Sequence, residues 1–148
     1  GDIMYMVLSI ARYIIQRCNS QNRPISNLKL QKILYFVQAE FLVTRNQACF
    51  SENIEAWDFG PVVPEVYQKY KIFGSANIPV FRKNDNNVKI PLSDREILNE
   101  IIDECSRYSA STLVDITHHQ TPWIEAYNKP GHNNVITKES IRKYFAEE

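Results

Sequence analysis

The sequence predicts a mainly α (α+β) fold, a single compact domain of about six helices with one or two small β-hairpins. Apolar residues recur at helical spacing through most of the chain, whereas β-favouring aromatic residues gather between residues 48 and 59. Proline and glycine fall mainly between these segments. With 148 residues, of which 44% are hydrophobic and 23% charged, the chain can bury one core, and we expect one domain over residues 2–148.

Two helices are predicted in the first part of the chain. The first spans about residues 4–19, and the second begins after Ser26, whose hydroxyl can cap it, and ends near Thr44. Lys29 and Lys32 lie off the apolar stripe of the second helix, so we expect them in solvent. The stripes consist of Val7, Leu8, Ala11, Ile14, Ile15 and Cys18 in the first helix and Leu30, Ile33, Leu34, Val37 and Phe41 in the second.

Residues 48–59 are predicted to form a hairpin. Aromatic and apolar residues lie on both sides of the polar residues 51–53, which are expected at the turn. We expect Gly60 to adopt a backbone conformation closed to other residues, where the chain leaves a strand and enters a helix. Pro64 suits the first turn of that helix, and Gly74 suits the position just after its end.

The second half of the chain is predicted to be helical after a less regular segment. Residues 75–92 fit either a second hairpin or a long surface loop, and the pattern leaves both open. A capping box of Ser93 and Glu96 is expected to start a helix that continues to Tyr108. Shorter elements follow: a helix capped by Ser109 or Ser111, a turn that starts at Pro122-Trp123, and a last helix capped by Thr137.

The charge balance argues against nucleic acid as a partner. Lysine and arginine number 17, as do aspartate and glutamate, so the formal net charge is zero, whereas nucleic-acid-binding domains usually carry a basic excess. Lys29, Lys32 and Arg45, interleaved with Tyr35 and Phe36, could form a phosphate-tracking patch, but zero net charge favours a core helix with a solvated lysine edge. A neutral protein has little electrostatic protection against association, which favours a protein partner or a homo-oligomer.

The cysteines and the hydropathy pattern predict a cytoplasmic protein. No apolar run approaches the ~18–20 residues of a membrane span, so we expect no membrane association. Cys18, Cys49 and Cys105 are odd in number and form no C-x-x-C motif, which argues against disulfides and against a cysteine-rich zinc site. Each lies in or beside an apolar run and is expected to be buried and reduced.

The sequence carries no motif for catalysis or for a cofactor. Neither G-x-S-x-G nor a glycine-rich phosphate loop occurs. A zinc site built from His118, Glu125 and His132 is conceivable, but cytosolic histidines are more often surface or helix-end residues. We therefore predict a protein that is not an enzyme and that holds no metal or cofactor.

Two strings of residues are similar to those of a known family. Residues 28–39, LKLQKILYFVQA, resemble the LKLQKLLYFAQ helix of the Panacea domain, and residues 54–67, IEAWDFGPVVPEVY, resemble its EAWxxGPVVPEVY string. Residues 113–118 with Pro122-Trp123 resemble a weaker third block, from which His119-Gln120 departs. The resemblance spans most of the chain.

The resemblance implies an antitoxin, the neutralising half of a bacterial or phage toxin–antitoxin pair. Proteins with the Panacea domain are similar in binding their toxins directly, so the resemblance implies a cognate toxin as partner and no catalytic residues. One member is similar in role to a proteolytic adaptor that delivers its toxin to a protease. Two alternatives therefore stay open: such an adaptor, or a nucleic-acid-binding regulator of its own operon.

The corner between the predicted hairpin and the following helix is the candidate partner-binding site. A rigid, protruding corner suits recognition because little flexibility is lost on binding. The same residues can also define the fold without touching a partner. Trp57 and Ala56 alternate along a predicted strand, so one of the two faces outward. The candidate residues are Trp57, Asp58, Gly60, Pro61, Val62, Pro64 and Tyr67.

Overall fold

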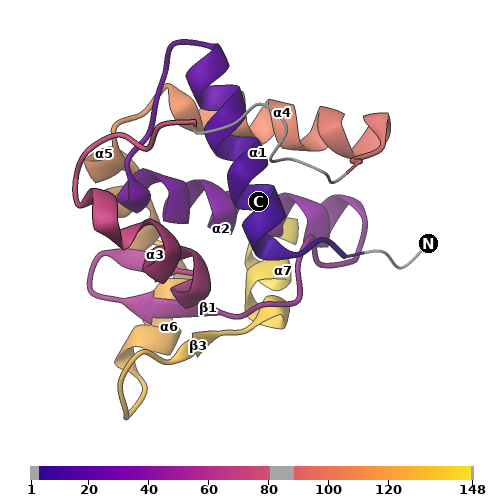
Figure 1. Ribbon diagram of the computed structural model, residues 1–148. Coiled ribbons are helices and arrows are strands. Elements are labelled where there is room, and N and C mark those ends of the chain that lie inside the picture. The colour runs from indigo at the N-terminus through magenta and orange to yellow at the C-terminus, as the bar shows by residue number, and fades with distance from the viewer. Residues whose placement is uncertain (1–3, 81–88, 148) are drawn as a thin grey trace.

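The computed structural model describes residues 4–80 and 89–147. Within these residues the protein has seven α-helices and one three-stranded antiparallel sheet, which confirms the mainly helical prediction (Figure 1). The helices are α1 (Val7–Ser20), α2 (Asn27–Thr44), α3 (Pro64–Tyr70), α4 (Leu92–Ser106), α5 (Ala110–His118), α6 (Thr121–Asn128) and α7 (Lys138–Ala146), with a 3-10 turn, η1 (Lys71–Phe73), after α3. The strands are β1 (Ile54–Trp57), β2 (Gly60–Val62) and β3 (Val135–Ile136). None of the described helices is both long enough and apolar enough to cross a membrane.

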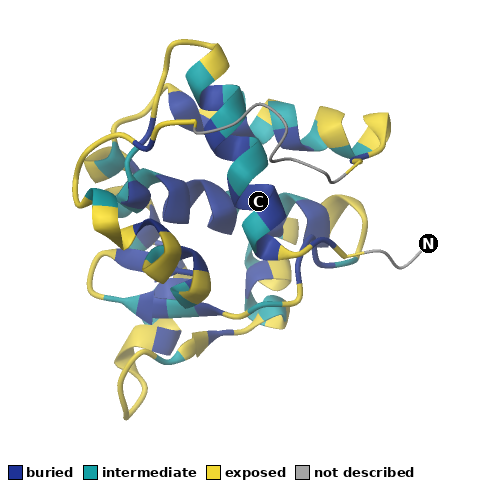
Figure 2. Cartoon of the chain, viewed as in Figure 1, coloured by how far each residue is buried: buried dark blue, intermediate teal, exposed yellow. Residues whose placement is uncertain are grey.

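Helix α2 runs through the middle of the molecule. It contacts α1, α3, α4, α5, α7 and β2, and Figure 2 shows buried residues along most of its visible length. Twelve of its 18 residues are buried, and Leu34 is fully buried as predicted. The surrounding elements cover α2 at Lys32, which is fully buried, so the prediction that Lys32 lies in solvent is wrong.

The buried apolar residues form one cluster around α2. Every described helix contributes at least one member, and the three cysteines are buried and free, as predicted. Representative members, in the order α1 to α7, are Ile14, Leu34, Val66, Ile102, Leu113, Trp123 and Ile141. Packing of this kind accounts for short helices that have little stability on their own.

Local sequence signals place most helix ends correctly. In each confirmed cap a side-chain oxygen accepts a backbone N–H of the first turn. The predicted capping box of Ser93 and Glu96 is wrong, because α4 already begins at Leu92 and Pro91 occupies the N-cap position. The confirmed N-caps are Ser26, Ser109 and Thr137.

The predicted hairpin over residues 48–59 is misplaced. Strand β1 pairs with β2, with Trp57 opposite Gly60, so the turn is formed by Asp58 and Phe59. Residues 51–53 instead precede β1. Gly60 has a φ of +102°, the left-handed geometry that a glycine supplies at the end of a tight hairpin loop, and residues 51–53 include no glycine. The positive φ was predicted, but the chain passes through β2 before α3 begins.

Strand β3 completes the sheet on the other side of β1, in the order β2-β1-β3. It pairs antiparallel with β1, with Glu55 opposite Val135. The second hairpin, considered for residues 75–92, falls largely on residues 81–88, which lie outside the described residues. Its described flanks carry no strand; Ile78 is buried and its N–H donates to the carbonyl of Ile25 in the α1–α2 loop (2.8 Å).

Candidate partner-binding site

The β1–β2 hairpin lies between α2 and the pair α5 and α6, and burial divides the seven predicted site residues into two groups. Asp58 is exposed, and Trp57, Pro64 and Tyr67 are half-buried. The remaining three, Gly60, Pro61 and Val62, are buried. The first group is available to a partner, whereas the second supports the hairpin from below.

Lys32 lies directly beneath the hairpin. Its Nζ donates a hydrogen bond to the carbonyl oxygen of Pro61 (2.8 Å), and no carboxylate pairs with it among the described residues. Burial lowers the pKa of Lys32 from its ordinary value to about 7. A Cβ added at Gly60 would lie 2.8 Å from Lys32 Cε and 2.9 Å from Thr117 Oγ1, so the lysine stem fills the space that only glycine leaves open.

Gln31 holds the connection between β2 and α3. Its Oε1 accepts the backbone N–H of Val63 (2.9 Å), and its Nε2 donates to Asn27 Oδ1 (2.9 Å). Asn27 in turn donates from Nδ2 to the carbonyl of Tyr67 in α3 (3.1 Å). A buried polar side chain needs such partners because an unpaired one costs about 1–3 kcal/mol.

Two more polar side chains of α2 bond to other segments. The hydroxyl of Tyr35 donates to Gln120 Oε1 between α5 and α6 (2.8 Å). Gln38 accepts the backbone N–H of Cys49 (2.7 Å) and donates to the carbonyl of Phe50 (2.8 Å). Sequence reasoning missed these roles, although polar residues in the middle of an apolar helix are the signal that reveals them.

The hairpin turn is fixed from the other side by α5 and α6. Trp123 Nε1 donates to the carbonyl of Trp57 (2.9 Å), and His118 Nε2 lies 3.0 Å from the carbonyl oxygen of Asp58. Tyr127 donates its hydroxyl proton to Asp58 Oδ1 (2.6 Å). The Trp123 ring lies tilted against His118 (centroids 4.2 Å apart) and stacks on Tyr127 (4.4 Å), so the supporting side chains also hold one another.

The outer side of the hairpin presents aromatic residues. Ala56 is buried, so Trp57 is the outward member of the alternating pair, and its ring meets Tyr67 edge to face at 5.0 Å. Phe59 at the turn is 66% exposed, which is unusual for a phenylalanine and was not among the predicted residues. We call Trp57, Asp58, Phe59, Tyr67 and Tyr127 the hairpin face.

The structure does not bring together the groups considered for zinc. Among the described residues no three histidine, cysteine, aspartate or glutamate side chains are placed to hold a metal ion. The His118 ring instead lies against Trp123 and is directed at the carbonyl of Asp58.

The basic residues considered for a phosphate-tracking patch are also separated. Lys32 is buried, and Lys29 is half-buried with its Nζ on the carbonyl of Ser106 (2.8 Å). Arg45 pairs with Asp94 (2.7 Å). The expected solvated lysine edge is therefore absent from this part of α2.

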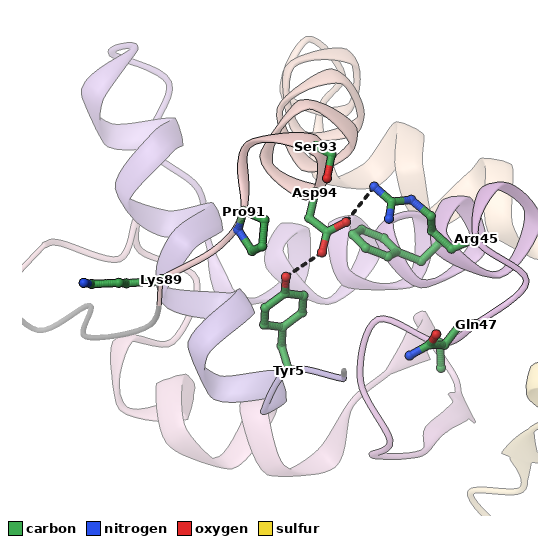
Figure 3. Close-up of a pocket in the computed structure, with 9 residues that line it drawn as sticks. Tyr5, Arg45, Gln47, Lys89, Pro91, Ser93 and Asp94 are labelled. Atoms are coloured by element: carbon green, nitrogen blue, oxygen red, sulfur yellow. Dashed lines mark hydrogen bonds and ion pairs between the residues drawn. The ribbon is translucent and has the colours of Figure 1, made fainter. Parts of the chain in front are cut away.

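A concave region with a volume of about 500 Å³ lies apart from the hairpin, between the segment before α1, the end of α2 and the start of α4 (Figure 3). The Tyr5 hydroxyl and the Arg45 guanidinium each bind one oxygen of Asp94, while Lys89 points away from them (Figure 3). Burial and the bond to Asp94 raise the pKa of Tyr5. These groups satisfy one another and tie three segments together, so we assign them a structural role.

Comparison with known proteins identifies the family. A family model described as "Antitoxin SocA-like, Panacea domain" matches residues 30–124, which is more than half of the chain. The chain belongs to this family. It is also 34% identical over 139 residues to "Antitoxin SocA" of Caulobacter vibrioides (strain NA1000 / CB15N), a match that covers 84% of this chain and 72% of that protein. No solved structure matches the chain.

Within this Panacea domain, the two strings that predicted the family lie against each other. The string of residues 28–39 forms most of α2, and the string of residues 54–67 forms the hairpin and the first half of α3. Gln31 and Lys32 of the first string bond to the backbone of Val63 and Pro61 in the second. The family strings therefore describe one buried contact as well as one exposed surface.

Proposed function

We propose that this protein is an antitoxin that neutralises a cognate toxin by binding it directly, without catalysis. Membership of the Panacea domain family supports the antitoxin role. The observation that carries direct binding is the exposed Phe59 on a hairpin fixed from two sides. Aromatic side chains of this kind are frequent anchors at protein interfaces.

The hairpin face is suited to tight binding because its conformation is set before a partner arrives. Hydrogen bonds from α2, α5 and α6 hold the backbone at Trp57, Asp58 and Pro61. Ordering a flexible loop would otherwise subtract from the binding free energy. We propose that Trp57, Asp58, Pro64 and Tyr67 contact the toxin, together with Phe59.

The buried candidates act differently under this proposal. Gly60, Pro61 and Val62 support the turn from within the protein and do not touch the toxin. A change at these positions would weaken binding only by moving the turn. We also propose that residues 2–148 act as one domain and that the protein works in the cytoplasm, where an internally produced toxin would meet it.

Co-expression with the product of the neighbouring gene tests the proposal. We expect a stable complex in size-exclusion chromatography, and growth rescue that titrates with the molar ratio of the two proteins. Phe59→Ala should weaken the complex by roughly tenfold or more. Leu92→Ala is the matched control, because Leu92 is similarly exposed (63%) but lies on α4, away from the hairpin in Figure 1.

The outcome of the titration separates stoichiometric binding from the alternatives. Sub-stoichiometric amounts of this protein could relieve toxicity while no complex survives chromatography. The hypothesis of direct neutralisation would then be wrong, and the hypothesis that the protein delivers the toxin to a protease would replace it. A gel-shift experiment with DNA upstream of the operon tests the other alternative, that the protein is a nucleic-acid-binding regulator of its own operon. Binding there, without a complex with the toxin, would also contradict the proposal.

A further inference from the structure

A small pocket opens on the hairpin face beside Asp58. Its volume is about 240 Å³, and its walls are formed by Asp58, Tyr127, and the loop before β3 with His132, Asn133 and Asn134. Sites for small molecules usually measure ~300–1,000 Å³, so this pocket suits a single side chain better than a metabolite.

Two side chains of the pocket, Asp58 and Asn134, present hydrogen-bond acceptors. Tyr127 occupies one carboxylate oxygen of Asp58, and no described residue bonds to the other. The amide nitrogen of Asn134 donates to the carbonyls of Ala126 and Lys129 (3.0 Å each), so that its oxygen remains an acceptor. A ligand that donates hydrogen bonds is therefore favoured over one that accepts them.

Negative charge predominates on the elements around the pocket, and the exposed Lys129, between α6 and the pocket loop, is a basic residue next to them. Residues 54–62 and 110–128, which form the hairpin, α5 and α6, contain four carboxylates and no lysine or arginine. The lining of the pocket likewise includes a carboxylate and no lysine or arginine. Lys32 lies nearby but is buried, so its charge is not presented to a partner. Such a surface attracts cations and repels anions.

Tyr127 adds a flat wall that distinguishes among cations. Its ring is stacked on Trp123 and remains 41% exposed. A guanidinium group is planar, stacks on aromatic rings and donates two parallel hydrogen bonds to a carboxylate, whereas an ammonium group offers a single point charge. Both features of the pocket, the ring of Tyr127 and the carboxylate of Asp58, fit the guanidinium.

We propose that this pocket receives an arginine side chain of the toxin, which stacks on Tyr127 and donates hydrogen bonds to Asp58. The inference rests on the proposed function and extends it, because it specifies a basic contact surface on the toxin. Phe59 and this arginine would then anchor neighbouring parts of the same interface, since Phe59 directly follows Asp58 in the turn.

The pocket is tested first without the toxin. We would titrate the full-length protein with N-acetylarginine amide and follow the backbone amide signals by NMR. Saturable shifts are expected at Asp58, Tyr127, Asn133 and Asn134. N-acetylcitrulline amide has nearly the same shape without the charge and should not produce them. Equal shifts with both compounds would overturn the inference.

Asp58→Asn removes the charge of the pocket and retains an oxygen for Tyr127. This variant should lose the arginine-dependent shifts, whereas Glu100→Gln, a matched change on the exposed side of α4, should retain them. Because Asp58 is exposed, the variant is expected to fold, which its unchanged amide spectrum elsewhere would verify. Retention of the shifts in Asp58→Asn contradicts the assignment.

Binding of the toxin to the natural protein and to Asp58→Asn then tests whether the pocket contributes to the complex. Asp58→Asn should weaken binding of the toxin by roughly 30-fold or more, the usual effect of removing one partner of a buried charge pair. If the variant loses the arginine probe but binds the toxin as tightly as the natural protein, the arginine inference fails while direct neutralisation stands. If neither protein binds the toxin, the proposed function itself fails.

Discussion

Replacing Lys32 by methionine removes the amine beneath the hairpin and keeps an unbranched side chain of similar length. The hydrogen bond from Nζ to the carbonyl of Pro61 is lost, while the packing against Gly60 is largely retained. The informative quantity is how the free energy of unfolding depends on pH, because burial lowers the pKa of Lys32 from 10.5 to about 7.

Proton linkage determines whether the free energy of unfolding rises or falls with pH. Between the two pKa values the unfolded chain holds a proton that the folded protein lacks, so raising the pH favours the folded state. Below the pKa that Lys32 has in the folded protein, the amine is protonated in both the folded and the unfolded state, and the cost of burying its charge is fully present. From about pH 6 to about pH 8.5, the natural protein should gain about 2 kcal/mol of unfolding free energy relative to Lys32→Met.

Urea denaturation of both proteins at several pH values measures this difference. Taking the difference cancels the contributions of other groups, including Cys18 and Cys105, whose pKa values are raised by burial to about 11 and about 12. Lys69→Met, a change of an exposed lysine on α3, is the control and should show no comparable pH dependence. A stability difference between the natural protein and Lys32→Met that stays constant across this range would mean that Lys32 keeps its charge, and the reasoning would be refuted.

Two further changes test the fold in the same denaturation assay. Gly60→Ala should lower the unfolding free energy by at least about 1–3 kcal/mol, because a φ of +102° strains any other residue and the new Cβ would meet Lys32 and Thr117. Unchanged stability would contradict this account of the turn. Leu34→Ala should lower the unfolding free energy by ~2–5 kcal/mol because the leucine side chain is fully buried. A loss below about 1 kcal/mol would contradict this expectation and show that neighbouring side chains move into the cavity that the leucine leaves.

Helix positions were predictable where the signal is local. Ser26, Ser109 and Thr137 cap helices through contacts within a few residues, so the sequence alone identifies them. The surroundings of α2 were not predictable in this way. Whether Lys32 meets water depends on the hairpin, whose Pro61 lies 29 residues further along the chain. Helical spacing carries no information about such packing.

The candidate site was predicted only in part, because some of its residues carry a local signal and others depend on long-range packing. The predicted corner between strand and helix gave the candidate residues, and Asp58 and Trp57 among them lie on the accessible side of the observed hairpin. Phe59 was missed because the turn was expected at residues 51–53; the glycine that follows Phe59 is the signal that would have placed it. Tyr127 and the pocket beside it depend on the packing of α6 against β1, which no local pattern reports.

The hairpin separates residues that are costly to change from residues that are free to vary. Lys32, Gly60 and Pro61 constrain one another's size and backbone geometry, so a substitution at one is expected to require compensation at another. Phe59 is exposed and its side chain has no hydrogen-bonding atom, so replacing it should change stability by no more than about 0.5 kcal/mol. Under the proposed function, selection for binding a different toxin can therefore change the residues of the turn while the residues beneath it stay the same.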